Sequence, residues 1–297
     1  MATHTLTRAP RTLTRRTHKP GENPWALGRI VAFAVLAVMA ALWLVPFAWA
    51  ILTSLKSETD AGASELQLSP PDGFSLDAYR KVLAAGNIPA WALNSLLTSV
   101  AITLVTVATA ALAGYAFSRI NFAGRRWLYA AIIGAIIIPP QVLIVPLFYE
   151  MLAFGLVDTY WGIILPQAFA PAMVLILKRF FDQIPIELEE AARVDGASRV
   201  RVFASIVLPL SRPILAAVAI FVFIGAWNNF LWPFIVTTDA DLMTLPVGLA
   251  TVKSAYGLQY AQNMATSILA ALPLVLVFLF FQRQIIKGIA TTGFGGQ

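Results

Sequence analysis

The sequence has 297 residues, of which 59% are hydrophobic and 12% are charged, whereas roughly a quarter of the residues in an average soluble domain are charged. So large an apolar share excludes a water-soluble fold, and the lack of cysteine excludes disulfides, thiol nucleophiles and thiolate metal sites. The net charge of +6 does not indicate nucleic acid, because basic residues gather in the cytoplasmic loops of membrane proteins. Since backbone groups in hydrocarbon must pair within their own segment, we expect an all-α membrane protein.

Six stretches of the chain contain no Asp, Glu, Lys or Arg and are long enough to cross a bilayer, which takes about 20 residues. The second helix is expected to start near Asn94 because Gly86 and Pro89 come before it, and the sixth near Ala265 because polar residues come before it. In chain order we predict a basic cytoplasmic tail (1–29), a six-helix domain (30–283) with spans at about 30–53, 94–118, 127–149, 159–177, 213–237 and 265–282, and a second cytoplasmic tail (284–297).

The basic residues predict which side of the membrane each loop occupies. If the amino terminus is cytoplasmic, 17 of the 21 Lys and Arg residues lie on the cytoplasmic side, so both termini are expected there. The first apolar stretch is too long for a signal peptide, and we expect it to be retained as a span. The largest outer loop, about 57–93, falls below the roughly 40 residues that a chain needs to fold alone, so a solute receptor would be a separate protein.

The longest predicted cytoplasmic loop, 178–212, has the pattern of two short helices joined by a turn. Pro185 suits the first turn of the first helix, and the acidic residues after it favour the positive end of that helix. Gly196 permits the chain to reverse, and Ser198 is a suitable cap for the second helix. The first helix would carry an apolar stripe formed by Ile184, Leu188 and Ala191. A helix of fewer than about 12 residues is marginal alone, so we expect a partner protein to receive it.

The same loop contains a set of fixed spacings. Glu190, Ala191 and Ala192 are followed by Gly196 after three residues, by Ile206 after nine more, and by Leu208 and Pro209 after one more. All seven positions match the EAA motif, and the chain thereby resembles the permease subunits of bacterial ATP-binding-cassette importers. The resemblance implies that the loop forms a coupling helix in a cleft of the ATPase subunit, with Glu190 and Gly196 central to the fit.

Five further segments narrow the resemblance. They are Asn-Ser-Leu at 94–96, Gly-Tyr-Ala-Phe at 114–117, Ile-Pro-Pro-Gln at 138–141, Thr-Tyr-Trp-Gly at 159–162 and Trp-Asn-Asn-Phe at 227–230. In this order they resemble the second of the two permeases of carbohydrate importers such as the maltose transporter, from about residue 44 to the carboxyl end.

This resemblance implies a set of partners in a bacterial plasma (inner) membrane. They are a second homologous permease, two ATPases that bind ATP and Mg, an extracytoplasmic solute-binding protein and membrane lipid, with no nucleic acid. The chain itself would hold no cofactor and no metal. Its last residues, 288–297, resemble family tails that reach between the two ATPases, and simple disorder explains them equally well.

Polar side chains at membrane depth are candidates for a solute pathway. They are Asn94, Gln141, Asn228 and Asn229, with Trp227 beside them. Sugars need amide donors and acceptors together with aromatic faces. Hydrogen bonds between helices use the same amides, and that alternative stays open. Prolines also interrupt the last four spans, and such breaks are tolerated only where protein or a water-filled cavity satisfies the backbone.

Other functional classes lack their usual motifs. The sequence contains no Gly-x-x-x-x-Gly-Lys-Ser/Thr loop and no hydrolase motif, so we expect no catalytic activity. Every carboxylate lies outside the spans, which argues against a proton-coupled carrier, and a sodium-coupled carrier leaves the EAA motif unexplained. We therefore predict an importer permease for a di- or oligosaccharide. Glycerol-phosphate or another polar solute stays open, because fold and motif are shared among such importers.

Overall fold

The computed structural model describes residues 26–63, 68–85, 87–252 and 259–293, and within these ranges all regular structure is helical. The chain divides into two compact units, residues 1–49 and 50–297. The first unit contains most of α1 (Ala26–Ser54), a helix that includes Pro46. Its segment Gly28–Ser54 is long and apolar enough to cross a membrane. Of the predicted basic tail (1–29), residues 1–25 lie outside the described residues, and residues 26–29 belong to the start of α1.

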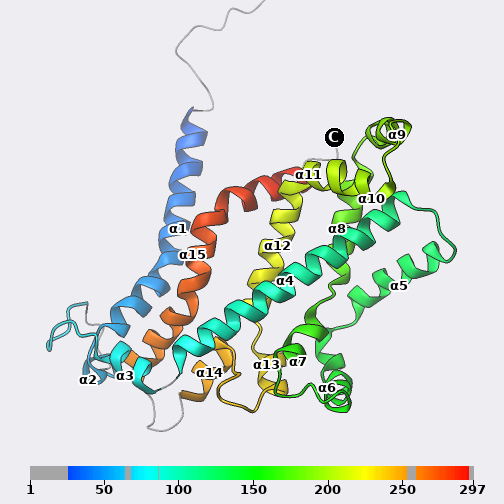
Figure 1. Cartoon of the computed structure of the whole chain (residues 1–297). Helices are drawn as coiled ribbons and strands as arrows, with labels where there is room; N and C mark the ends of the chain where they lie inside the picture. The colour runs from blue at the N-terminus through cyan, green and yellow to red at the C-terminus, as the bar shows by residue number, and fades with distance from the viewer. Residues whose placement is uncertain (1–25, 64–67, 86, 253–258, 294–297) are drawn as a thin grey trace, which may run out of the picture. The chain divides into compact units, whose positions relative to one another are not determined.

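The second unit is built around one long helix, α4. In chain order its elements are α2 (Glu58–Ala61), α3 (Asp77–Ala85), α4 (Ile88–Arg119), α5 (Arg125–Ile137), η1 (Pro140–Leu143), α6 (Ile144–Ala153), α7 (Tyr160–Ile164), η2 (Leu165–Gln167), α8 (Pro171–Asp182), α9 (Ile186–Val194), α10 (Arg199–Val202), the π-helical η3 (Phe203–Val207), α11 (Leu208–Leu210), α12 (Arg212–Trp227), α13 (Leu231–Val236), α14 (Leu245–Val252) and α15 (Tyr260–Gly293). Helix α4 packs against α8 and α12, and α12 packs against α15. Helix α4 extends from the end of the unit that holds α3 and α14 to the end that holds α9 and α10 (Figure 1).

The helices account for between three and six membrane spans. Within the described residues, Gly28–Ser54, Ile88–Arg119 and Tyr260–Phe280 are each sufficient in length and composition, and three bent helix pairs raise the number to as many as six. One of these pairs, Arg199–Leu210 with Arg212–Trp227, is bent by 79° and begins inside the predicted cytoplasmic loop. The part of the protein that the structure describes is all-helical and rich in apolar helices, as the composition predicts.

Two predicted helix starts are wrong. Helix α4 begins at Ile88 rather than near Asn94, because Pro89 sits in the first turn, where no backbone donor is needed. Helix α15 begins at Tyr260 rather than near Ala265. The carboxylate of Glu58 accepts hydrogen bonds from the backbone N–H groups of Ala261 (3.2 Å) and Gln262 (2.9 Å), which satisfies donors that the first turn leaves free. A local proline therefore sets the start of α4, and a tertiary contact extends the start of α15.

Three predicted spans are broken rather than continuous. The stretch 127–149 is divided into α5 and α6, which meet at an angle of 97° after the two prolines 139 and 140. The stretch 159–177 bends by 49° between η2 and α8. In 213–237, α12 ends at Trp227 and α13 begins at Leu231. Proline lacks a backbone donor and clashes with the preceding turn, so the first two breaks follow from Pro140 and Pro171.

Two loops of the second unit are tied together by Asp158. Its side chain accepts hydrogen bonds from the Thr238 hydroxyl (2.6 Å) and from the backbone N–H groups of Asp239 (2.9 Å) and Thr238 (2.5 Å). The hydroxyl of Thr238 and these N–H groups hold the pKa of the Asp158 carboxyl below its ordinary value. The loop before α7 and the loop after α13 are therefore joined, which fixes the ends of two broken spans.

A close approach between Gly248 and Trp91 links α14 to α4. A Cβ atom at Gly248 would lie 2.1 Å from Cδ2 of the Trp91 indole, and Trp91 is buried in a core cluster with Trp227, Leu245 and Ala261. A buried ring has little room to move, because protein interiors are close-packed. Glycine at 248 is therefore required by space rather than by backbone conformation.

We expect Gly248→Ala to lower the free energy of unfolding by roughly 1 to 3 kcal/mol, the usual cost of an overpacked core. The melting temperature of the purified protein measures this effect. Gly134→Ala is the matched control, because Gly134 lies inside α5 and a Cβ atom there meets nothing within 4 Å. Equal melting temperatures for Gly248→Ala and the unaltered protein would contradict the close contact.

Candidate functional site

The loop between α8 and α12 forms two short helices, as its sequence predicts. Pro185 immediately precedes α9, and Glu187 and Glu189 lie in its first turn. After α9, Gly196 takes a φ of +86°. Its backbone N–H donates to the Arg193 carbonyl (3.0 Å), and the next N–H, of residue 197, donates to the carbonyl of residue 192 (2.9 Å). These two bonds are a Schellman motif, which needs a left-handed residue where Gly196 stands.

The second helix of the loop is capped as predicted. The Ser198 side chain accepts a hydrogen bond from the Arg201 backbone N–H (3.3 Å), which confirms Ser198 as the N-cap of α10. Val202 and Val207, which follow this cap in the chain, are buried. Val207 belongs to a core cluster with residues of α4, α8 and α12. The second half of the loop is therefore anchored in the protein core.

The predicted apolar stripe on the first helix is wrong. Ile184 lies before α9 and is buried in the core cluster, whereas Leu188 and Ala191 are exposed. Pro185 causes this difference, because a residue that precedes proline is disfavoured in the helical conformation. The exposed large apolar side chains of α9 and α10 are Ile186, Leu188, Val194 and Val200. Val194 is 87% exposed, and no described part of the chain covers it.

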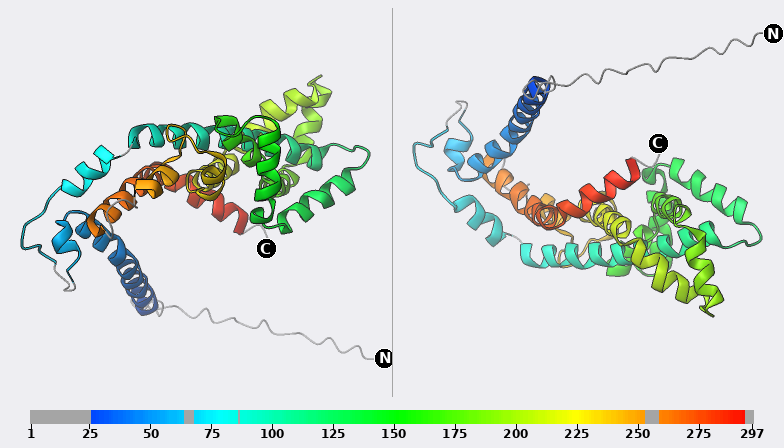
Figure 2. Two further views of the ribbon diagram at one scale, coloured as in Figure 1. Left: turned by 90° about the horizontal axis from the view of Figure 1, so that it is seen from below. Right: turned by 90° about the horizontal axis from the view of Figure 1, so that it is seen from above.

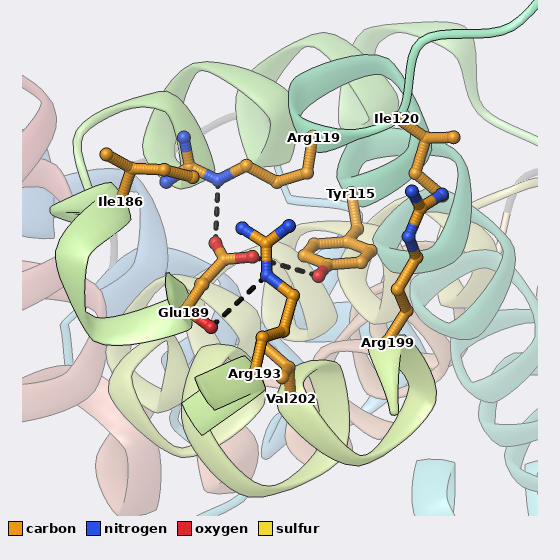
Figure 3. A pocket seen from close by; sticks show the side chains of 8 residues that line it. All are labelled: Tyr115, Arg119, Ile120, Ile186, Glu189, Arg193, Arg199 and Val202. Atoms are coloured by element: carbon orange, nitrogen blue, oxygen red, sulfur yellow. Dashed lines mark hydrogen bonds and ion pairs between the residues drawn. The ribbon is translucent and has the colours of Figure 1, made fainter. Parts of the chain in front are cut away.

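The buried residue of α9 is Glu189, which is 2% exposed. Its Oε1 atom forms an ion pair with Nε of Arg119 at 2.7 Å, and its Oε2 atom accepts a hydrogen bond from the Tyr115 hydroxyl at 3.0 Å (Figure 3). Nη2 of Arg119 also donates to the carbonyl oxygens of Phe181 (2.7 Å) and Ile184 (2.5 Å). One guanidinium therefore joins the end of α4 to the end of α8 and to α9.

A cavity of about 20 Å³ borders this network. Arg193 and Arg199 also line it, and Nε of Arg193 donates to the Glu189 backbone carbonyl at 3.3 Å (Figure 3). Sequence reasoning missed both Glu189 and Arg119. Nothing local distinguishes Glu189 from the other acidic residues of α9, and its partner is 70 positions away.

The seven residues of the EAA motif lie in two groups, one on or just after α9 and one in the segment from η3 to α11. Glu190, Ala191 and Gly196 are exposed and Ala192 is partly buried, all of them on or just after α9. Within the described part of the chain, no hydrogen bond or ion pair holds the Glu190 side chain. Ile206 and Leu208 are partly buried, and Pro209 is exposed. Leu208 packs against the core cluster of α4, α8 and α12.

Three of the five predicted pathway residues, Asn94, Trp227 and Asn228, do not line the cleft that the other two share. Asn94 is 3% exposed, and its Nδ2 atom donates to the carbonyl oxygens of Asp241 (2.7 Å) and Met243 (3.0 Å). Its Oδ1 atom accepts from the Tyr160 hydroxyl (2.7 Å), so its amide is fully used. Trp227 is buried and stacks on Phe223. Asn228 is exposed and donates to the carbonyl of residue 224 in its own helix (3.0 Å).

The other two, Gln141 and Asn229, line one cleft of about 290 Å³. Gln167 and Trp232 also line it, and Nδ2 of Asn229 donates to Oε1 of Gln167 at 2.5 Å. Gln167 was not among the predicted residues. The three helix breaks at η1, at η2 and between α12 and α13 all contribute to the walls of this cleft. The cleft is thus lined by amide groups and an indole, and it lies where the helices are interrupted.

Known proteins are similar to this chain in sequence and in fold. The family "binding-protein-dependent transport system inner membrane component" matches residues 106–290. The arabinooligosaccharides transport system permease protein of Halalkalibacterium halodurans is 35% identical over 268 residues, which are 90% of this chain and 95% of that protein. The trehalose/maltose transport system permease protein of Thermococcus litoralis is 34% identical over 277 residues, which are 91% of this chain and 98% of that protein.

A solved structure extends the comparison to three dimensions. It is a bacterial ABC transporter involved in the import of the acidic polysaccharide alginate, and one of its chains superposes with a TM-score of 0.77 at 21% identity. The match covers 88% of this chain and 98% of that chain, so the two share a fold over nearly their whole length.

Proposed function

The chain belongs to the binding-protein-dependent transport system inner membrane components, and on that premise we propose that it is one of two permeases that together import a di- or oligosaccharide. It is a multi-pass protein of the inner membrane. Its proposed partners are a second homologous permease, two ATPases that bind ATP and Mg, and an extracytoplasmic solute-binding protein. Curated relatives that transport arabinooligosaccharides and trehalose or maltose support the sugar class.

The arrangement of α9 carries the coupling part of this proposal. Its buried Glu189 is paired with Arg119, while Ile186, Leu188 and Val194 are exposed on its surface. Exposed apolar side chains on a short helix favour a protein partner, because a helix of this length gains its stability from packing. The same helix is thus bonded to the permease core through one side chain and free to dock through others. An ATPase subunit on the cytoplasmic side is the partner we propose.

The Arg119 contacts support a route from α9 into the membrane domain. A displacement of α9 would pull on Glu189, and through Arg119 on the ends of α4 and α8. Helix α4 extends over 32 residues to the opposite end of the unit, where Asn94 binds the loop before α14. A single rigid helix therefore connects the proposed ATPase contact to the outer loops, as alternating access requires.

The cleft between the broken helices is the proposed solute pathway. Gln141, Gln167 and Asn229 offer amide donors and acceptors for sugar hydroxyl groups, and Trp232 lines the same cleft. Backbone interruptions near the middle of a membrane domain are typical of transporter sites. Asn94, Trp227 and Asn228 lie elsewhere, and we assign them no solute contact.

The coupling role is tested by reversing the charge of Glu190 together with Gly196→Pro. We expect the double variant still to insert into the membrane, while sugar uptake into vesicles falls by at least about tenfold, within the usual range of allosteric coupling. ATP hydrolysis and uptake are measured on the same preparation, so that uncoupling appears as hydrolysis without transport. Glu150→Lys is the control, because Glu150 is also exposed and lies on α6 rather than in the loop. Normal uptake by the double variant would contradict the role proposed for α9.

A further inference from the structure

An open, basic pocket lies where α4 turns into α5, apart from the cleft and from the Glu189 network. It has a volume of about 610 Å³. Its cationic side chains are Arg125, Arg126 and Lys178, and its aromatic side chains include Phe117, Trp127 and Tyr129. Figure 2 shows α5 turning back from the end of α4 after a short loop, and α8 packs against both helices. The pocket therefore combines residues from three helices.

The pocket carries more positive than negative charge. Nζ of Lys178 lies 2.6 Å from a carboxylate oxygen of Asp182 and 5.4 Å from the centre of the Tyr129 ring. Arg125 donates to the Asn121 side chain (2.9 Å) and to the Phe117 carbonyl, both of them neutral acceptors. Within the described residues, no ion pair or hydrogen bond holds the side chain of Arg126. The pocket thus has three cations and one carboxylate, and this excess of positive charge favours an anionic ligand.

The three cations lie at the ends of apolar helical segments. Helix α5 contains no charged residue after Arg126, and α8 contains none before Lys178. Trp127 is 81% exposed at the same level. Basic residues and exposed tryptophan at the end of an apolar helix are typical of the boundary between hydrocarbon and headgroups. A ligand here would have its phosphate beside the cations and its chains beside the apolar surface of α5.

We propose that this pocket binds the headgroup of an anionic phospholipid, with Arg126 and Lys178 contacting the phosphate and Trp127 lying at the boundary of the acyl chains. Basic pockets between transmembrane helices recognise such headgroups, and each cation adds to the attraction. The bound lipid would join α5 to α8 beside the Ser118–Asp182 hydrogen bond (2.7 Å), which already ties α8 to α4. This site is independent of the coupling role proposed for α9.

The test compares lipid binding by the purified importer and by the variant Arg126→Gln/Lys178→Gln. Native mass spectrometry counts the bound lipid, and the melting temperature is followed during titration with phosphatidylglycerol or with phosphatidylcholine. We expect phosphatidylglycerol to bind the unaltered importer and raise its melting temperature, and the double variant to bind it roughly 30-fold more weakly. Arg126→Gln alone is a second variant, because its exposed side chain has no structural partner within the described residues, and we expect it to keep the fold intact while it weakens phosphatidylglycerol binding.

The control variant is Arg80→Gln/Lys81→Gln, which removes two exposed basic residues of α3 at the opposite end of the unit. We expect it to retain full phosphatidylglycerol binding. An equal loss in this control would show a general charge effect and overturn the proposal, as would equal stabilisation by phosphatidylcholine. Inorganic phosphate is titrated separately. A melting-temperature rise with phosphate as large as with the lipid would identify a free-anion site and also overturn the proposal.

Discussion

Glu189→Lys is expected to lower the free energy of unfolding by roughly 3 to 5 kcal/mol, the usual cost of breaking a buried ion pair from one side. The variant replaces the carboxylate that lies 2.7 Å from Nε of Arg119 with a second cation, and the Arg119 side chain is only 13% exposed. It also removes the acceptor of the Tyr115 hydroxyl. Uptake should fall with stability, because α9 loses its attachment to α4. The melting temperature of the purified importer and sugar uptake into vesicles measure the two effects.

A double-mutant cycle for this pair compares the charge-swapped variant Arg119→Glu/Glu189→Arg with its two single variants, Arg119→Glu and Glu189→Arg. We expect the charge-swapped variant to recover part of the stability and part of the uptake, although not the bonds from Arg119 to the carbonyls of Phe181 and Ile184. Glu187→Lys is the control, since Glu187 is an exposed acidic residue of the same helix turn. If Glu187→Lys and Glu189→Lys were equally destabilising, the buried pair would have no special role.

The second large effect is expected for Asn94→Leu, which should lower the free energy of unfolding by about 3 kcal/mol. The substitution removes three hydrogen bonds of a buried amide, to the Tyr160 hydroxyl and to the carbonyls of Asp241 and Met243, and each lost bond costs roughly 1 kcal/mol. We expect a lower melting temperature and less assembled importer. The apparent affinity for sugar of the importer that does assemble should be unchanged.

Asn228→Leu is the matched control for Asn94, because Asn228 is exposed and bonds only to its own helix. Its effect on stability should lie within about 0.5 kcal/mol, as is usual for surface positions. A stable Asn94→Leu variant with altered sugar preference would instead place Asn94 in the solute pathway. The two variants therefore test whether the Asn94 amide stabilises the fold or binds the solute.

Much of this protein follows from local chemistry along the chain. The uncharged stretches predict apolar helices, because hydrocarbon requires backbone groups to pair internally. Gly196 and Ser198 predict the turn and the cap inside the 178–212 loop, and both are present, because backbone conformation and capping depend on a few neighbouring residues. Proline likewise predicts interruptions: the breaks at Pro140 and Pro171 agree, whereas α15 continues through Pro273 and the predicted interruption of the sixth span is wrong. The membership of the family was predicted from seven positions of the loop and is confirmed.

Contacts between distant segments settle the remaining features. Glu58 adds a turn to the start of α15, more than 200 positions further along the chain, and no local pattern signals this cap. Gln167 meets Asn229 only because two broken helices bring their interruptions to one cleft. The acidic residues of α9 look alike in the sequence, and Glu189 is the buried one because Arg119, 70 positions earlier, lies within 2.7 Å. Burial of a charge depends on a partner in space, and spacing along one helix does not specify that partner.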